Sequence, residues 1–305
     1  MADQRILTPR ASAELLLLGL IWGGVFLSVR LTLDAVPLVT AVLHRTFWAM
    51  LVLWGVVLWL RLPLPGLATW GAFLVMGLLN NVIPFGLIAW GQLHIESGLT
   101  SILNATTAVF GVIVAALVFA DERLTPRRML GVGLGFAGVV TAIGPGALAG
   151  FDLRSAAQLA VLGGTLSYAL AGAWARRTLS HLPAPVAAAG MLTASTLMLA
   201  PAALLIDGAP DLALPLRTWG AIAYSSVIAT AGAYLLYYRV LAMAGSGNLM
   251  LVTLLIPPVA IVLGALVLGE ALHPSAYAGF ALLALGLVIL NRRPARPIDP
   301  VPAAR

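Results

Sequence analysis

Residues 122–126, Glu-Arg-Leu-Thr-Pro, return as residues 270–274, Glu-Ala-Leu-His-Pro, at an offset of 148 positions. Two further pairs recur in the same order: Trp70-Gly71 returns as Trp219-Gly220, and Ser97-Gly98 returns as Ser246-Gly247, both at an offset of 149. Arg30 and Val36-Pro37 return as Arg176 and Leu182-Pro183, 146 positions on. The second half of the chain therefore repeats the first.

The composition is that of an integral membrane protein. Of the 305 residues, 61% are hydrophobic and only 9% are charged, far from the balance of a soluble domain. A membrane span must be a helix or part of a closed barrel, because the bilayer offers no water to free backbone groups. Long apolar runs such as residues 15–20 and 249–268 lack the alternation of barrel strands. We expect an all-α integral membrane protein.

Charged residues and Pro/Gly breaks divide the chain into ten predicted transmembrane helices, five in each repeat. They cover residues 13–33, 37–60, 68–92, 98–120, 127–145, 156–177, 183–206, 216–239, 248–269 and 274–291. Because five is odd, the second repeat must enter the membrane upside down relative to the first. Inverted repeats of this kind build alternating-access transporters with a substrate site near the midplane. The predicted fold is therefore two inverted five-helix repeats.

The basic residues predict the orientation. All 17 are arginines; 13 fall on one side of the predicted membrane, three (Arg30, Arg154, Arg217) fall on the other, and Arg45 lies inside a span. By the positive-inside rule both termini are cytoplasmic. The basic net charge is scattered over helix ends, so orientation explains it better than binding of nucleic acid.

The predicted helices divide the chain into five segments. They are a cytoplasmic N-terminal segment (1–12), the first five-helix repeat (13–145), a connecting loop (146–154), the second repeat (155–291) and a disordered Pro/Arg-rich cytoplasmic tail (292–305). The first span is interpreted as a retained helix and not a signal peptide. The absence of cysteine excludes disulfides and thiolate metal sites.

His44-Arg45 is the charged exception in the membrane interior. A charge at this depth is expensive, so by default it indicates function. Arg45 could hold a carboxylate with two hydrogen bonds, or could serve a structural role by bonding helix-end carbonyls or reaching outward. His44 could titrate near neutral pH. All 11 acidic residues fall in loops or at helix ends, so coupling through an intramembrane carboxylate is not expected.

Helical spacing gathers further substrate-binding candidates. Thr40, His44 and Trp48 share one face of the second span, and Ser226, Thr230, Tyr234 and Tyr238 share one face of the eighth. Asn80 and Asn81 lie at mid-depth in the third span. Trp22 and Tyr168 occupy equivalent positions in the two repeats, at an offset of 146. Core packing is the alternative for each residue taken alone.

Proline and glycine mark gating and packing candidates. Pro84 follows the asparagine pair, and Pro257-Pro258 is predicted to interrupt the ninth span as a hinge, a gate or a fixed kink. Residues 133–138 match G-x-G-x-x-G, but no strand precedes them, so a dinucleotide site is not expected. Gly131 with Gly135, like Gly19 with Gly23, has the spacing that lets helices approach closely. Glu122 and Glu270 are interpreted as helix-end structure.

The order of these features resembles the drug/metabolite transporter superfamily, specifically its ten-helix EamA-type members. The resemblance rests on Ile21-Trp22-Gly23-Gly24, on Pro37 followed by Arg45, on the two Ser-Gly helix starts and on the two Glu-x-Leu-x-Pro segments, and covers about residues 13–291. It implies a central cavity between the halves and export of amino acids, other metabolites or drugs from bacteria. The family proline of the fourth span is missing near Thr106-Thr107, which argues against symmetric gating.

Within that family the chain looks similar to the aromatic amino-acid exporters. A ring could stack on Trp or Tyr, a carboxylate could bind Arg45 or Asn80, and an ammonium could meet Tyr faces. We therefore expect an inner-membrane exporter or exchanger of amino acids, aromatic or otherwise neutral. It is expected to be a monomer or weak homodimer in the lipid bilayer, without cofactor, metal or nucleic acid. Export of hydrophobic drugs or other small metabolites is the alternative; a channel or an intramembrane enzyme is more distant, since no H-E-x-x-H or nucleophile–base pair is found.

Overall fold

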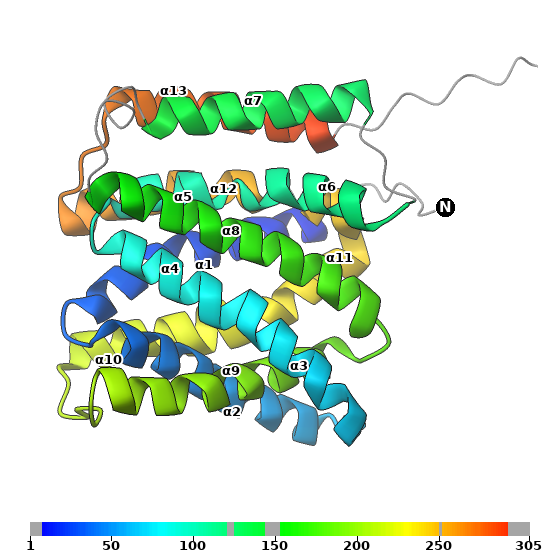
Figure 1. Ribbon diagram of the computed structural model, residues 1–305, viewed down its shortest axis with the longest axis vertical. Coiled ribbons are helices and arrows are strands. Elements are labelled where there is room, and N and C mark those ends of the chain that lie inside the picture. Colours follow the sequence, from blue (N-terminus) through cyan, green and yellow to red (C-terminus); the bar gives the residue numbers. More distant parts are fainter. Residues whose placement is uncertain (1–7, 121–124, 144–152, 250–251, 292–305) are drawn as a thin grey trace, which may run out of the picture.

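The computed structural model describes residues 8–120, 125–143, 153–249 and 252–291, and the secondary structure in these ranges is helical, without strands (Figure 1). Several predictions concern residues outside these ranges. The loop at 146–152, Glu122, the tail at 292–305 and the first seven residues lie outside the described residues.

The described helices group into ten spans. Those of the first half are α1 (Pro9–Leu33), α2 (Leu38–Trp59), the third span η1 (Leu67–Thr69), α3 (Trp70–Gly77), η2 (Leu78–Val82) and α4 (Ile83–Gln92), the fourth span α5 (Ser97–Asn104) and α6 (Thr107–Val118), and α7 (Pro126–Ile143). Those of the second half are α8 (Leu153–Thr178), α9 (Ala184–Ile206), the eighth span α10 (Leu216–Ala223), η4 (Tyr224–Gly232) and α11 (Ala233–Leu249), the ninth span α12 (Val252–Leu263) and η5 (Gly264–Leu268), and α13 (Pro274–Asn291).

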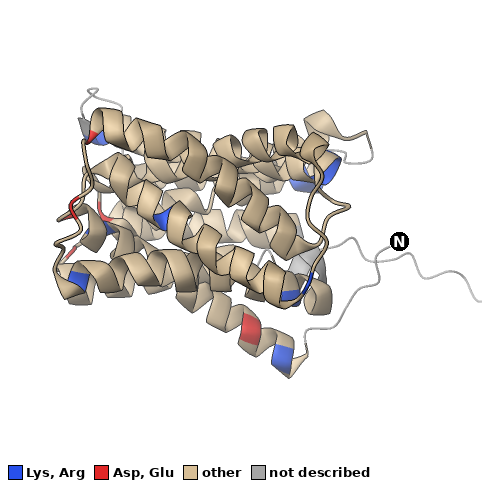
Figure 2. Ribbon diagram, turned by 90° about the horizontal axis from the view of Figure 1, so that it is seen from below, with Lys and Arg blue, Asp and Glu red and all other residues tan. Residues whose placement is uncertain are grey.

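The helices form a multi-pass membrane bundle. Among the described residues, seven helices are long and apolar enough to cross a membrane, and Val252–Leu268 and Pro274–Leu290 are shorter apolar helices. The first turn of α7 carries Arg127 and Arg128, which makes this helix less apolar on average. Figure 2 shows most charged residues gathered at the two ends of the bundle, with an almost uncharged middle, as the positions of the bilayer surfaces require.

The two halves pack with a two-fold relation. Equivalent helices pair with each other, α2 with α9 and α7 with α13, and these pairs lie at opposite ends of the long axis in Figure 1. The first helix of each half packs on the third and fourth spans of the other: α1 contacts α11 and α12, and α8 contacts α4 and α6. This exchange of contacts confirms the expected inverted repeats and places a common interface at the centre.

Glycines set the closest helix contacts, as their spacing predicts. A Cβ at Gly138 would lie 2.6 Å from the backbone nitrogen of Leu283, and a Cβ at Gly279 would lie 2.4 Å from that of Ala142. Gly23 meets Val259 in the same way, at 2.4 Å. The G-x-G-x-x-G segment therefore serves helix packing in α7.

The third span of each half contains a stretch of π-helix. An offset of 149 carries η2 (78–82) onto residues 227–231, inside η4. A π-turn leaves carbonyls without their usual helical donors, and side chains from the opposite repeat supply them. Ser167 Oγ donates to the carbonyl of Leu79 at 2.6 Å, and Trp22 Nε1 donates to that of Ala229 at 3.2 Å. η2 lies directly before Pro84, where the sequence indicated distortion.

Two helix boundaries and one expected break differ from the prediction. α1 begins at Pro9, four residues early, because Thr8 caps it with a 3.2 Å hydrogen bond to the Ala11 amide and proline suits the first turn. The eighth span continues to Leu249, so Arg239 lies within a helix and not in a loop. Pro257 and Pro258 lie inside the continuous helix α12, so the expected break in the helix is wrong, whereas a hinge, a gate or a kink at these prolines stays a prediction.

The break lies in the other repeat, in the fourth span, which has no proline. α5 ends at Asn104 and α6 begins at Thr107. Thr106 and Thr107 donate their hydroxyls to the carbonyls of Leu103 and Asn104, at 2.7 and 2.8 Å. Such local side-chain bonds compete with helical ones. The fourth span and its equivalent, the ninth span, therefore differ, as the missing proline suggested. The break at the centre, however, is in the span without proline.

Candidate functional site

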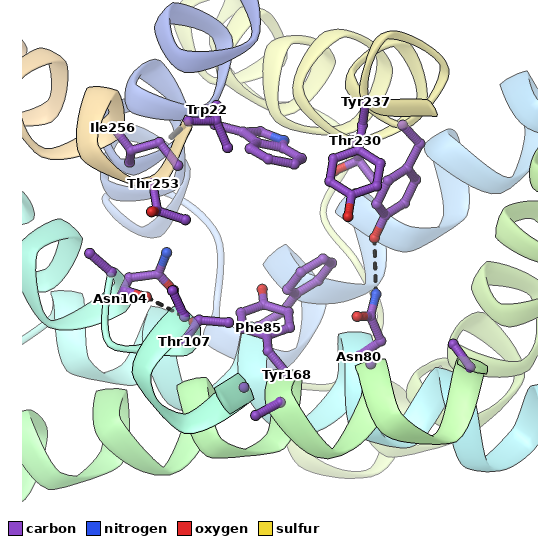
Figure 3. Close-up of a pocket in the computed structure, with 18 of the residues that line it drawn as sticks. Trp22, Asn80, Phe85, Asn104, Thr107, Tyr168, Thr230, Tyr237, Thr253 and Ile256 are labelled. Carbon is purple, nitrogen blue, oxygen red and sulfur yellow. Dashed lines mark hydrogen bonds between the residues drawn. The ribbon is translucent and has the colours of Figure 1, made fainter. Parts of the chain in front are cut away.

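A cavity of about 850 Å³ lies between the two halves (Figure 3). It receives side chains from α1, α2, the third and fourth spans, α8 and α9, and from the second-half spans containing η4, α11 and α12. Seven of the ten predicted substrate-binding residues line it: Trp22, Arg45, Asn80, Tyr168, Thr230, Tyr234 and Tyr238. Its volume falls in the range of small-molecule sites.

Arg45 provides the charge of the site. It is the eighth of the 22 residues of α2, and its Nε donates to Thr230 Oγ1 at 3.1 Å. The guanidinium carbon lies 3.7 Å from the centre of the Phe85 ring, which fixes the plane of the group. Among the described residues no carboxylate is within ion-pair distance of Arg45. The cavity therefore presents a fixed positive charge without a protein counter-ion in this part of the chain.

The Thr230 hydroxyl is itself held in place by the π-helix. It donates to the carbonyl of Ser225 at 2.7 Å, a separation of five residues. With its hydrogen thus engaged, the Thr230 oxygen can accept the bond from Arg45. The irregularity in η4 therefore positions the arginine.

Asn80 and Tyr234 form a polar pair beside Arg45. Asn80 Nδ2 donates to Tyr234 Oη at 3.1 Å and lies 3.7 Å from the sulfur of Met191 (Figure 3). Asn80 belongs to η2, and Tyr234 is the second residue of α11, the helix that directly follows η4. Both π-helical stretches thus contribute to the polar part of the cavity wall.

Aromatic rings make up two further parts of the wall. The rings of Trp22 and Tyr237 have centroids 5.8 Å apart, and those of Tyr237 and Tyr238 are 5.4 Å apart. Phe85 and Tyr168 meet edge to face at 6.5 Å. Trp22 and Tyr168, at equivalent positions in the repeats, both face the cavity. An aromatic ligand would find edges and faces on both sides.

Three predicted residues lie away from the cavity lining. His44 accepts a 3.2 Å hydrogen bond from Trp48 Nε1, and its ring packs against Trp219 at 5.6 Å. Asn81 donates to Ser195 Oγ at 2.8 Å. The face shared by Thr40, His44 and Trp48 turns toward α10, while Arg45, one position on, turns to the cavity. The structure therefore separates His44 from Arg45.

Several lining residues lacked a sequence signal that singled them out. Phe85 and Tyr237 carry no motif, and their roles depend on how distant helices meet. Met191 could have been found, because it is the repeat equivalent of Arg45. Asn104 and Thr253 could have been found in the same way, because an offset of 149 relates them and both line the cavity.

The cavity extends toward the arginine-rich ends of the helices. Arg128 and Arg176 line it at that end, and Gln92 lines it at the other. Beyond Gln92, two ionic contacts join the halves. Arg154 forms hydrogen bonds of 3.2 and 2.9 Å to Glu96, and the Glu270 carboxylate accepts from the Ser97 amide at 3.0 and 2.9 Å.

Glu270 has a more specific function than ending its own helix. Its carboxylate covers the first amides of α5, in the opposite repeat, where the helix dipole favours a negative charge. Gly264 leaves the space, since a Cβ there would lie 2.4 Å from Glu270 Oε2. The equivalent Glu122 lies outside the described residues.

Comparison with known proteins gives the family. The model of the EamA-like transporter family matches the chain twice, over residues 12–144 and 155–292. The chain belongs to the EamA-like transporter family. It is therefore a membrane transporter, as the resemblance implied.

Relatives and solved structures agree with this assignment. A protein of Streptantibioticus cattleyicolor described as a probable terminal-alkyne amino-acid exporter is 29% identical over 68% of each chain. A Salmonella typhimurium protein described as a probable amino-acid metabolite efflux pump is 25% identical, over 90% of this chain and 92% of its own. A solved crystal structure has a TM-score of 0.64 at 17% identity, covering 92% of this chain and 97% of the other; it supports the fold alone.

Proposed function

We propose that this EamA-family transporter exports neutral amino acids, aromatic ones above all, across the bacterial inner membrane by alternating access. The observation that carries the proposal is Arg45, a guanidinium fixed by Thr230 and Phe85 in a cavity with aromatic walls. A carboxylate is the ligand group that best matches such a guanidinium. An aromatic side chain matches the surrounding rings.

The electrostatics of the cavity favour this ligand over a cationic drug. Among the described lining residues the charged ones are Arg45, Arg128 and Arg176, and none is acidic. A hydrophobic cation would lie near the Arg45 guanidinium, and no acidic residue among the described lining residues would offset its charge, so its binding would carry a high electrostatic cost. The names of the relatives, an amino-acid exporter and an amino-acid metabolite efflux pump, support the same choice. Export of uncharged drugs or other metabolites remains the alternative.

The arginine distribution supports a cytoplasmic location of both termini and of the open end of the cavity. In that orientation the described conformation accepts substrate from the cytoplasm. The contacts of Glu270 and Arg154 then lie toward the outside and close the other entrance. Their exchange for contacts at the cytoplasmic end would complete the transport cycle, the order of events expected for inverted repeats.

Ligand-dependent stability tests the choice of substrate. A ligand that binds the folded protein raises its melting temperature. Phenylalanine and tryptophan should raise the melting temperature of the purified transporter, whereas phenethylamine, which lacks the carboxylate, and tetraphenylphosphonium, a hydrophobic cation, should not. Stabilisation by the two cations without any by the amino acids would favour the drug exporter.

A further inference from the structure

The cavity has a second polar part, away from Arg45. Figure 3 shows Asn104 and Thr253 on the side of the cavity opposite Asn80 and Thr230, and Thr230 is the residue that holds Arg45. The rings of Phe85 and Tyr168 lie between the two polar regions in this view. Much of the neighbouring wall is apolar, with Ala108 and Ile256 among its residues.

The break in the fourth span puts Asn104 in this wall. Asn104 is the last residue of α5, and the hydroxyl of Thr107 donates to its carbonyl at 2.8 Å. The neighbouring Thr106 bonds the Thr165 hydroxyl of α8 at 2.9 Å. These bonds fix the turn without a proline, and they leave the side chain of Asn104 out of the turn's own hydrogen bonding.

The carboxamide of Asn104 has unused hydrogen-bonding capacity. Its Oδ1 is buried and has no hydrogen-bond partner. A buried acceptor without a donor is unfavourable and uncommon. Rotation about the terminal side-chain torsion, which is broad for asparagine, exchanges the two ends of the amide and turns the oxygen to the cavity. In that rotamer the amide nitrogen takes the buried position, and a ligand in the cavity that brings a donor would satisfy the oxygen.

We propose that Asn104, with Thr253 beside it, binds the polar group at the far end of the substrate side chain and determines specificity among aromatic amino acids. With the carboxylate on Arg45 and the ring between the aromatic walls, the far edge of the ring points to Asn104. The indole N–H of tryptophan and the hydroxyl of tyrosine can donate to Oδ1; phenylalanine has no such group. The inference rests on the proposed function.

The physical basis of this selectivity is the free energy lost when a polar group of the site has no hydrogen-bond partner. A site built to bond a substrate O–H or N–H discriminates against an analogue that lacks it, because the acceptor of the site stays unpaired. The transporter should therefore favour tyrosine and tryptophan over phenylalanine. Thr253, at the position equivalent to Asn104 in the second repeat, lies beside it on the same side of the cavity (Figure 3).

The test compares the three amino acids in proteoliposomes. The ratio of kcat/KM for tyrosine over phenylalanine, and for tryptophan over phenylalanine, is measured by uptake against an unlabelled internal pool. In Asn104→Leu we expect both ratios to fall about tenfold, a factor typical of one lost hydrogen bond, with phenylalanine transport retained. Thr141→Val, on α7 outside the cavity lining, serves as control, and Asn104→Ala, which also removes the carboxamide, replaces the leucine variant should that one not fold.

Each outcome bears on the proposal. Unchanged ratios in Asn104→Leu, or in Asn104→Ala in its place, would overturn the role of Asn104 while leaving amino-acid transport standing. A wild-type protein that favours phenylalanine would overturn it as well. Absence of transport for all three amino acids would overturn the proposed function and this inference with it.

Discussion

Arg45 is the residue on which substrate recognition depends in our proposal. Its Nε bond to Thr230 and its stacking on Phe85 use one donor and one face of the guanidinium, and a guanidinium has five N–H donors in all. The unused donors can form the paired bonds that a carboxylate accepts. The α2 backbone carries this residue toward the cavity, while the adjacent His44 packs outside it.

Replacement of Arg45 tests this role. Arg45→Gln should weaken binding of phenylalanine about tenfold to a hundredfold, because a hydrogen bond to a charged group contributes about 1.5–3 kcal/mol. The measurement is a titration of the purified protein with phenylalanine. Arg217→Gln, at an exposed position outside the cavity lining, is the matched control. Equal affinities in wild type and Arg45→Gln would make the arginine structural.

His44 was a candidate for the substrate site, but it lies outside the cavity lining. It accepts a hydrogen bond from Trp48 and packs on Trp219. His44→Phe should leave the pH dependence of transport unchanged and lower stability by about 1 kcal/mol, because Trp48 loses its acceptor. The pH profile and the melting temperature check this. A flattened pH profile with unchanged stability would instead return His44 to the transport mechanism.

At the scale of elements, the contact between α7 and α13 depends on glycines, which have no side chain and let the two helices approach closely. A Cβ at Gly279 would lie 2.4 Å from the Ala142 nitrogen, whereas one at Gly133, on the open face of α7, would meet nothing within 4 Å. Gly279→Val should destabilise the fold by about 1–3 kcal/mol through overpacking, and Gly133→Val should change little. The melting temperatures of the two variants in detergent measure the difference. Equal melting temperatures would show that the helices do not rely on this contact.

A second contact between elements joins the two halves, between the Glu270 carboxylate and the first turn of α5. Glu270→Gln removes the charge that accepts from the first amides of α5, so the closed end of the cavity should open more often. The chain has no cysteine, and Val29→Cys in the cavity wall can report this opening. A membrane-impermeant maleimide applied from the outside should label it several-fold faster in the Glu270→Gln background.

The control for that experiment is Asp211→Asn. Asp211 lies in the exposed connection before α10, where its carboxylate accepts from the Ala213 amide, and it is not part of the link between the halves. The Asp211→Asn substitution should leave the rate of maleimide labelling at Val29→Cys unchanged. Equal rates in all three backgrounds would show that Glu270 does not hold the closed end.

The elements were largely predictable from the sequence, because apolar runs and charged ends report the bilayer directly. The failures have physical causes. Pro257 and Pro258 remain inside α12, since neighbouring helices hold a helix that proline alone would weaken. The break at Asn104 was missed because hydroxyl-to-carbonyl bonds of Thr106 and Thr107, and not proline, produce it.

At the scale of the whole molecule, the repeat predicted the architecture and part of the site. It related Trp22 to Tyr168 and Arg45 to Met191, and all four residues line the cavity. Periodicity within a single helix was less informative. It grouped His44 with Trp48 but did not indicate which neighbouring helix their face would contact. Contacts between distant helices, such as Arg45 on Phe85, could not be predicted from one chain.

The two repeats are related by a two-fold symmetry, but the side chains at equivalent positions in the cavity are different. Arg45 faces the cavity from one repeat while its equivalent, Met191, contacts Asn80, so the guanidinium at this position has no counterpart in the second half. A site of this kind can orient a ligand that has one charged end and one aromatic end. In our proposal the two-fold scaffold allows the exchange of conformations, and the unequal side chains recognise the substrate.

Transport of aromatic amino acids by the purified protein tests the central claim most directly. Proteoliposomes loaded with unlabelled phenylalanine and diluted into labelled phenylalanine should accumulate label well above liposomes without protein, and Arg45→Gln should abolish most of that uptake. Absence of uptake by the wild-type protein for phenylalanine, tyrosine, tryptophan and the other neutral amino acids alike would contradict the account.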